Sequence, residues 1–311
     1  YLEKCLSLVK QRGYDFILTR ETLLGLKDRE SIYPLALAAY WNGIEKDYLS
    51  QVLSLRGIEN DRYHPGYTLW VQTFGNFRVW RGDRLVETQD WKREKARRFF
   101  QILLANRGKW VHKDQINEWL WPESTADNSA SYLKVIYNAV NQVLEPDRPR
   151  GEDPFFIERR QESYRLNPKA RLMVDADLFV QKINQGSPGM LENALNLYQG
   201  RYLADSPVSE WLTIEEQYYH QQFMLAADQL LSHYIEMDNY PQALDTSYQI
   251  LNQDPFWEAA YRAQMLVFHK LGQHSMVHEV YHRCTEMLSE QLNAPISHET
   301  EGLYQQLVSE L

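Results

Sequence analysis

The chain has 311 residues, of which 44% are hydrophobic and 24% charged, a composition typical of a globular protein with two or three domains. Its net charge of −9 argues against a phosphate-binding surface that covers the whole molecule. No apolar stretch approaches the roughly eighteen residues that a membrane span needs, and no secretory signal is present, so we expect a cytoplasmic protein with no membrane partner. The two cysteines, Cys5 and Cys284, fit a reducing compartment.

Residues 1–60 are expected to be helical. Apolar residues recur there at helical spacing: Leu2, Leu6 and Val9, and then Ile32, Leu35, Ala36 and Ala39. Glycines fall at the expected helix ends, namely Gly13, Gly43 and Gly57. Because the helical pattern starts at Tyr1, we expect this segment to be the end of an upstream helical-repeat domain. The polar stretch Glu59–Gly66 ends in Pro-Gly and is a candidate linker.

Residues 66–170 differ from the rest of the chain in charge. They hold 18 Lys and Arg against 14 Asp and Glu, a net charge of +4, so the remaining residues together carry −13. Phosphate binding depends on local positive charge rather than on the total. A basic segment in an acidic chain therefore keeps nucleic-acid binding open.

The same residues follow the order strands, helices, hairpin. Short β-rich segments are expected at Leu69–Phe74, Phe77–Trp80 and Leu85–Val86. Helices are expected from Lys92, over Gln115–Leu120 and over Ser129–Leu144, and a hairpin is expected from Phe155–Arg159 and Ser163–Leu166. This is the order of a winged helix, in which one helix enters the major groove and the hairpin, called the wing, reaches the neighbouring DNA backbone.

The helix over Ser129–Leu144 is the candidate recognition helix. Apolar positions would seat it on its own domain, namely Leu133, Tyr137, Val140 and Leu144. The rest of its surface would carry the candidate DNA-binding residues Ser131, Lys134, Val135, Asn138, Asn141 and Gln142. Asn and Gln can bond adenine, Lys can bond guanine or phosphate, and Val135 can touch a thymine methyl.

An ordinary amphipathic helix with a solvent-facing side explains that pattern too, and for this helix alone it is the better explanation. Cations elsewhere in the segment favour DNA. The candidates for phosphate contact are Arg159 and Arg160 in the wing and Lys113 and Arg148 in nearby loops.

Residues 171–311 are expected to be helical repeats. Asn239-Tyr240-Pro241-Gln242-Ala243 and Gln273-His274-Ser275-Met276-Val277 open helices 34 residues apart, which is the period of tetratricopeptide-like helix pairs. Such pairs must stack to bury their apolar faces. The predicted fold class is therefore mainly α: a winged helix over 66–170, a tetratricopeptide-like domain over 171–311, and a helical segment over 1–60 before them.

Several short motifs resemble a known family in their order and spacing. Asn106-Arg107-Gly108-Lys109-Trp110-Val111, Leu120-Trp121-Pro122, Leu144-Glu145-Pro146 and Tyr164-Arg165-Leu166 resemble the OmpR/PhoB-type winged helix, most closely the version in SARP-type regulators. Tyr198-Gln199-Gly200-Arg201-Tyr202-Leu203, Tyr240-Pro241-Gln242-Ala243-Leu244 and Asp254-Pro255-Phe256-Trp257-Glu258 resemble the bacterial transcriptional activator domain. Residues 1–60 are similar to the end of a sensor in large MalT-like regulators.

This resemblance implies a sequence-specific DNA-binding transcriptional activator whose partners are double-stranded DNA, RNA polymerase and a second copy of the chain. One departure matters, because the family's third helix is Arg-rich at the positions of Ala139, Asn141 and Gln142, and those arginines are absent here. The base preference should therefore differ. The alternative is a protein-interaction scaffold whose winged helix no longer binds DNA, which the Arg-poor helix supports.

Catalytic, cofactor and metal sites are not expected. The sequence contains no Gly-x-x-x-x-Gly-Lys-Ser/Thr, Gly-x-Ser-x-Gly or His-Glu-x-x-His motif. His274, His278 and His282 repeat at four-residue spacing near Cys284, but polar positions on a repeat helix explain them better than zinc ligation does.

Overall fold

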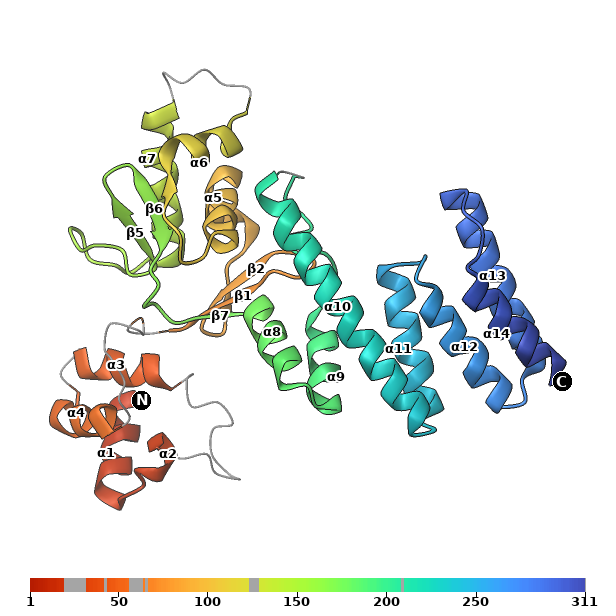
Figure 1. The fold of residues 1–311 in the computed structure, drawn as a ribbon. Coiled ribbons are helices and arrows are strands. Elements are labelled where there is room, and N and C mark those ends of the chain that lie inside the picture. The colour runs from red at the N-terminus through yellow and green to blue at the C-terminus, as the bar shows by residue number, and fades with distance from the viewer. Residues whose placement is uncertain are drawn as a thin grey trace. The chain divides into compact units, whose positions relative to one another are not determined.

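The computed structural model describes residues 1–19, 32–41, 44–55, 64, 67–122, 129–207 and 210–310. These ranges are mainly helical, with two small sheets in the N-terminal half (Figure 1). The chain forms two compact units: the first comprises Tyr1–Val174 and Asp205–Thr213, and the second Asp175–Ala204 and Ile214–Leu311. None of the described helices is long and apolar enough to cross a membrane.

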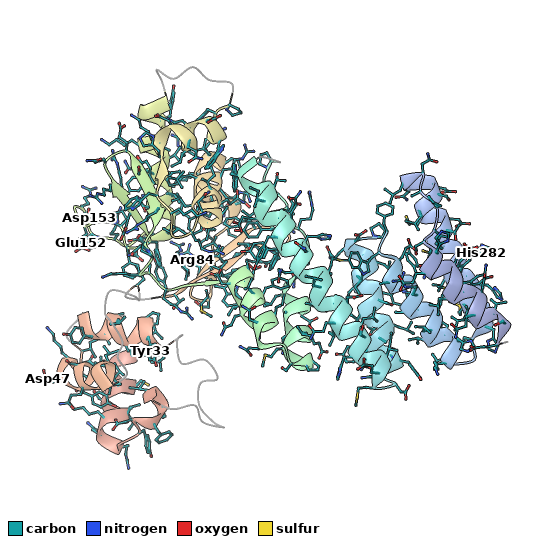
Figure 2. The ribbon with its side chains drawn as sticks, in the orientation of Figure 1. Tyr33, Asp47, Arg84, Glu152, Asp153 and His282 are labelled. Carbon is teal, nitrogen blue, oxygen red and sulfur yellow. The ribbon has the colours of Figure 1, made fainter. Side chains whose placement is uncertain are left out.

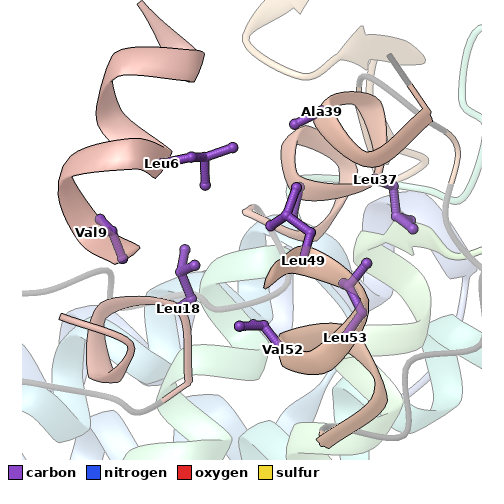
Figure 3. Packing of buried hydrophobic residues seen from close by; sticks show 9 residues of the cluster. Leu6, Val9, Leu18, Leu37, Ala39, Leu49, Val52 and Leu53 are labelled. Atoms are coloured by element: carbon purple, nitrogen blue, oxygen red, sulfur yellow. The ribbon is translucent and has the colours of Figure 1, made fainter. Parts of the chain in front are cut away.

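The described residues before the sheets are helical, as the spacing predicts, and form α1 (Leu2–Arg12), α2 (Phe16–Thr19), α3 (Tyr33–Trp41) and α4 (Lys46–Leu55). Their apolar side chains share one core, shown in Figure 3. Leu6 and Val9 from α1 are buried in it. Helix α1 ends at Gly13, whose φ of 64° is the left-handed conformation that glycine adopts without strain.

The predicted core face of α3 is wrong at one position. Leu35 is 45% exposed, whereas Leu37 is fully buried. Nearly every residue of α3 is apolar, so the spacing alone does not choose a face. Gly43, Gly57 and all of the candidate linker except His64 lie outside the described residues.

The first sheet has the strand order β3-β2-β1-β7. Strands β1 (Leu69–Gln72), β2 (Arg78–Arg81) and β3 (Arg84–Leu85) lie at the three predicted β-rich segments, and neighbouring strands pair antiparallel. Strand β7 (Leu172–Val174) was not predicted and pairs in parallel with β1, with Leu172 opposite Leu69. The chain therefore returns to its first strand after the wing.

The predicted strands, helices and hairpin of the winged helix are confirmed. After the short 3-10 helix η1 (Thr88–Trp91) come α5 (Glu94–Ala105), α6 (Lys113–Leu120) and α7 (Ser129–Leu144). The wing is β5 (Ile157–Arg160) and β6 (Ser163–Leu166), and the short strand β4 (Val111–His112) extends it in the order β4-β6-β5. Helix α5 is the most buried of the three, because seven of its twelve residues are in the core.

The segment Asp205–Thr213 packs against α5 and α6 within the first unit. Asp205 forms an ion pair with Arg97, and the Ser206 hydroxyl donates to Gln101 Oε1 at 2.8 Å. Gln101 is fully buried, so these partners satisfy an amide that would otherwise be costly in the core. The winged helix is thus completed by residues that follow it by more than thirty positions in the sequence.

The second unit is all helical in its described residues. Its helices are α8 (Asp175–Gln185), α9 (Pro188–Leu197), α10 (Glu210–Glu236, whose first residues belong to the first unit), α11 (Tyr240–Gln253), α12 (Glu258–Lys270), α13 (His274–Leu292) and α14 (His298–Ser309). Asn239 and Gln273 precede α11 and α13, as the 34-residue period predicts. The core of α12–α14 is built around Tyr261, Met265 and Phe268.

Candidate nucleic-acid interface

Helix α7 presents one face to the core of its unit and one to solvent. The four predicted seating residues are buried, namely Leu133, Tyr137, Val140 and Leu144. The Tyr137 ring contacts the Tyr164 ring of the wing, with centroids 5.2 Å apart. This contact packs the helix against the hairpin.

The prediction that Asn141 faces DNA is wrong. Its side chain is 1% exposed, and Nδ2 donates to the Tyr137 carbonyl, one turn earlier, at 2.9 Å. A helical wheel places Asn141 at the border of the apolar face, about 40° from Tyr137 and about 60° from Leu144. The polar side chain alone misled the assignment. The amide that was expected to read a base instead satisfies a backbone carbonyl of its own helix.

The remaining described candidates on α7 lie at the surface: Lys134, Val135, Asn138 and Gln142 are exposed. At about 100° per residue, Val135, Asn138 and Gln142 fall within an arc of about 60°, with Lys134 on one flank. Gln142 Oε1 accepts from Lys92 Nζ at 3.3 Å. The side chain of Ser131 lies outside the described part of the structure.

Tyr132 belongs to this exposed surface and was missed. Its side chain is 56% exposed, and its ring lies 6.4 Å from that of Trp121 between centroids. It stands three residues before Val135, on the opposite flank of the arc from Lys134. Its helical spacing relative to Val135 and Asn138 is the signal that could have placed it there.

A buried carboxylate joins the end of α7 to the start of the wing. Glu145 is 4% exposed and accepts from the Phe155 backbone N–H at 3.0 Å and the Phe156 N–H at 3.2 Å. Burial raises the pKa of Glu145, although the two backbone N–H groups oppose that shift. The Tyr67 hydroxyl also donates to the Leu144 carbonyl at 2.6 Å. These bonds explain why Leu144-Glu145-Pro146 ends the helix at this position.

The wing exposes one cation with no side-chain partner among the described residues. Its turn runs through Gln161, whose φ is 53°. Arg159 Nε donates to the Gln161 carbonyl at 3.3 Å, and its guanidinium lies 5.7 Å from the centre of the Tyr164 ring. Arg160, at the tip, is exposed and free to contact a phosphate.

Two of the predicted phosphate contacts are occupied within the protein. Lys113 forms an ion pair with Glu162 of the wing turn, and that carboxylate raises the pKa of the lysine. Arg148 Nη1 donates to the Glu152 carbonyl at 3.0 Å in the loop after α7, where Figure 2 labels Glu152. Both cations are bonded within the protein, so Lys134 and Arg160 are the two of the five predicted basic candidates that have no partner in the described part of the chain.

One histidine of α13 contacts the following helix. His278 Nδ1 lies 2.7 Å from the Tyr304 hydroxyl of α14. Among the described residues, no three His, Cys, Asp or Glu side chains are grouped so that they could hold a metal ion.

Comparisons with known proteins give a family for the C-terminal part and a fold for most of the chain. Residues 182–308 match the model of the bacterial transcriptional activator domain. A search of curated proteins found no match. Among solved structures, Mycobacterium tuberculosis EmbR in complex with a low-affinity phosphopeptide is similar, with a TM-score of 0.63 and 16% identity.

The alignment with EmbR covers 78% of this chain and 65% of that one, so the chain spans less than two thirds of its structural relative. The shared fold and the family match agree with the order of elements described above, a winged helix followed by helical repeats. Residues 182–308 are thus similar to the bacterial transcriptional activator domain, and the fold of most of the chain is similar to that of EmbR.

Proposed function

We propose that this protein is a sequence-specific DNA-binding activator that inserts α7 into the major groove and places the wing on the adjacent backbone. The observation that carries the proposal is the joint surface of α7 and the wing. Among the described residues nothing bonds the Asn138 amide or pairs with Lys134 and Arg160, so the amide is available to base edges and the two cations to phosphates. The Tyr137–Tyr164 contact holds the two parts at a fixed spacing.

We assign a separate role to each part of the chain. The winged helix over 66–170 binds DNA, and the repeats over 171–311 contact RNA polymerase or a second copy of the chain in the cytoplasm. Activation then works by tethering: holding polymerase near the promoter raises its effective concentration there and needs no catalytic residue, cofactor or metal.

A protein-interaction scaffold is the second candidate. Ile214, Tyr218 and Leu225 of α10 are 72%, 42% and 57% exposed and lie on one side of that helix. Exposed apolar residues at helical spacing are typical of a surface that a partner covers. The salt dependence of binding distinguishes the two functions, because phosphate contacts weaken steeply as the salt concentration rises and apolar contacts do not.

Replacing Arg160 with alanine tests the wing. We expect the variant to bind all duplexes about five- to tenfold more weakly near 0.1 M salt, because it loses one phosphate contact and the counterion release that accompanies it. Fluorescence anisotropy with labelled duplexes measures this. The sequence preference should stay unchanged, since a phosphate contact carries no base information.

Arg84→Ala is the matched control, because Arg84 is an exposed arginine on the separate sheet β3-β2-β1-β7 (Figure 2). It should bind as the native protein does. Equal losses in both variants would mean that any surface arginine contributes, and no loss in either would remove the wing from the interface.

A further inference from the structure

The exposed surface of α7 has a chemistry that distinguishes base pairs. Its central residues are Val135 and Asn138, three positions apart on the same side of the helix. Val135 is 44% exposed, and Asn138 is exposed and makes no side-chain hydrogen bond to another described residue. An apolar group and a free amide therefore stand together where base edges would lie.

The residues next to Val135 and Asn138 are less available for contacts with bases. The Gln142 amide oxygen is held by Lys92, so this amide cannot offer both of its groups to one adenine without losing that bond. The Tyr132 ring contacts the Trp121 ring. Lys134 is the only basic residue in the sequence of α7, and it lies about 100° round the helix from Val135. The face has no guanidinium to make the two hydrogen bonds that guanine favours.

The spacing of the pair matches a base step. Three residues of helix advance by about 4.5 Å, close to the roughly 3.4 Å between stacked base pairs. A free asparagine amide pairs with adenine N6 and N7, and an exposed aliphatic group packs on the thymine C5-methyl. Both partners belong to A·T pairs.

We propose that α7 selects a step of two adjacent A·T pairs, in which Asn138 bonds one adenine and Val135 covers a thymine methyl. This inference rests on the proposed function, that α7 enters the major groove, and names the DNA that it takes. It accounts for a recognition helix that lacks arginine: the helix reads methyl groups and adenine edges in place of guanine.

Replacing thymine by deoxyuridine removes only the C5-methyl and tests the inference directly. The full chain is first used to enrich binding duplexes from a random pool, and each thymine of the enriched site is then replaced singly. We expect adjacent A·T pairs in the core of the site. One replacement should weaken binding about fourfold, the loss of one buried methyl group.

Val135→Ala should bind the thymine and uracil duplexes equally, whereas the control Arg84→Ala should keep the fourfold difference. A core of G·C pairs, uniform tolerance of uracil, or a difference that persists in Val135→Ala would each overturn the inference while leaving DNA binding intact. Failure to enrich any duplex would instead reject the proposed function, and the base preference with it.

Discussion

Replacing Glu145 with alanine should lower the free energy of unfolding of the first unit by about 3 kcal/mol. The substitution leaves the backbone N–H groups of Phe155 and Phe156 without their acceptor, and Phe156 is fully buried. Each unsatisfied buried group costs about 1–3 kcal/mol. Urea unfolding followed by tryptophan fluorescence measures the change.

Glu145→Gln is the matched control, because its amide oxygen can still accept from both N–H groups. It should lose less than half as much stability as the alanine variant. If both variants unfold at the native urea concentration, Glu145 is not what joins α7 to the wing. An equal loss of stability in both variants would mean that the charge of Glu145, and not its role as a hydrogen-bond acceptor, stabilises the unit.

His64 should make the stability of the first unit depend on pH. Its ring stacks on that of Phe156 and contacts that of Tyr67 at a tilt, with centroids 5.1 and 4.3 Å away. Its Nδ1 is buried without a hydrogen-bond partner among the described residues. Burial lowers the pKa of His64 from 6.5 to about 4. The unfolded chain therefore takes up a proton before the folded one does.

Because the unfolded chain is protonated at higher pH than the folded one, acid lowers the free energy of unfolding. The contribution of His64 is fully present above pH 6.5 and is lost as pH falls through about 4, reaching a loss of about 2.5 kcal/mol at pH 4.5. Urea unfolding of native protein and of His64→Phe at pH 7.5, 6 and 4.5 measures it. The phenylalanine keeps the stacking and does not titrate, so the difference between the two proteins should grow towards low pH. A constant difference would show that His64 does not titrate in this range.

The sequence predicts those elements whose periodicity is long and strong. Helix α7 has the predicted bounds, Ser129–Leu144, because its apolar positions repeat over four turns. The wing and the 34-residue repeat were found for the same reason. Strands β4 and β7 were missed because each has only two or three residues and depends on a partner far away in the chain.

The site was harder to predict than the fold, because its residues depend on tertiary neighbours. Nothing local in the sequence shows that Glu162 neutralises Lys113. The burial of Asn141 follows from how α7 is rotated on its core, and a border position on a helical wheel leaves that rotation open within tens of degrees. Glu145 was visible only as part of a motif, and its role became clear from the two N–H groups that it accepts.

The proposed function requires α7 and the wing to bind duplex DNA through phosphates and base edges. Binding of the full chain to pooled random duplexes, measured by fluorescence anisotropy between 50 and 200 mM salt, tests it most directly. If Lys134 and Arg160 are the residues that contact phosphates, the affinity for DNA should fall about tenfold as salt rises over that range. Further phosphate contacts would make the fall larger. A folded protein that binds no duplex at 50 mM salt, or whose binding changes less than about twofold, would contradict the claim and favour the interaction scaffold.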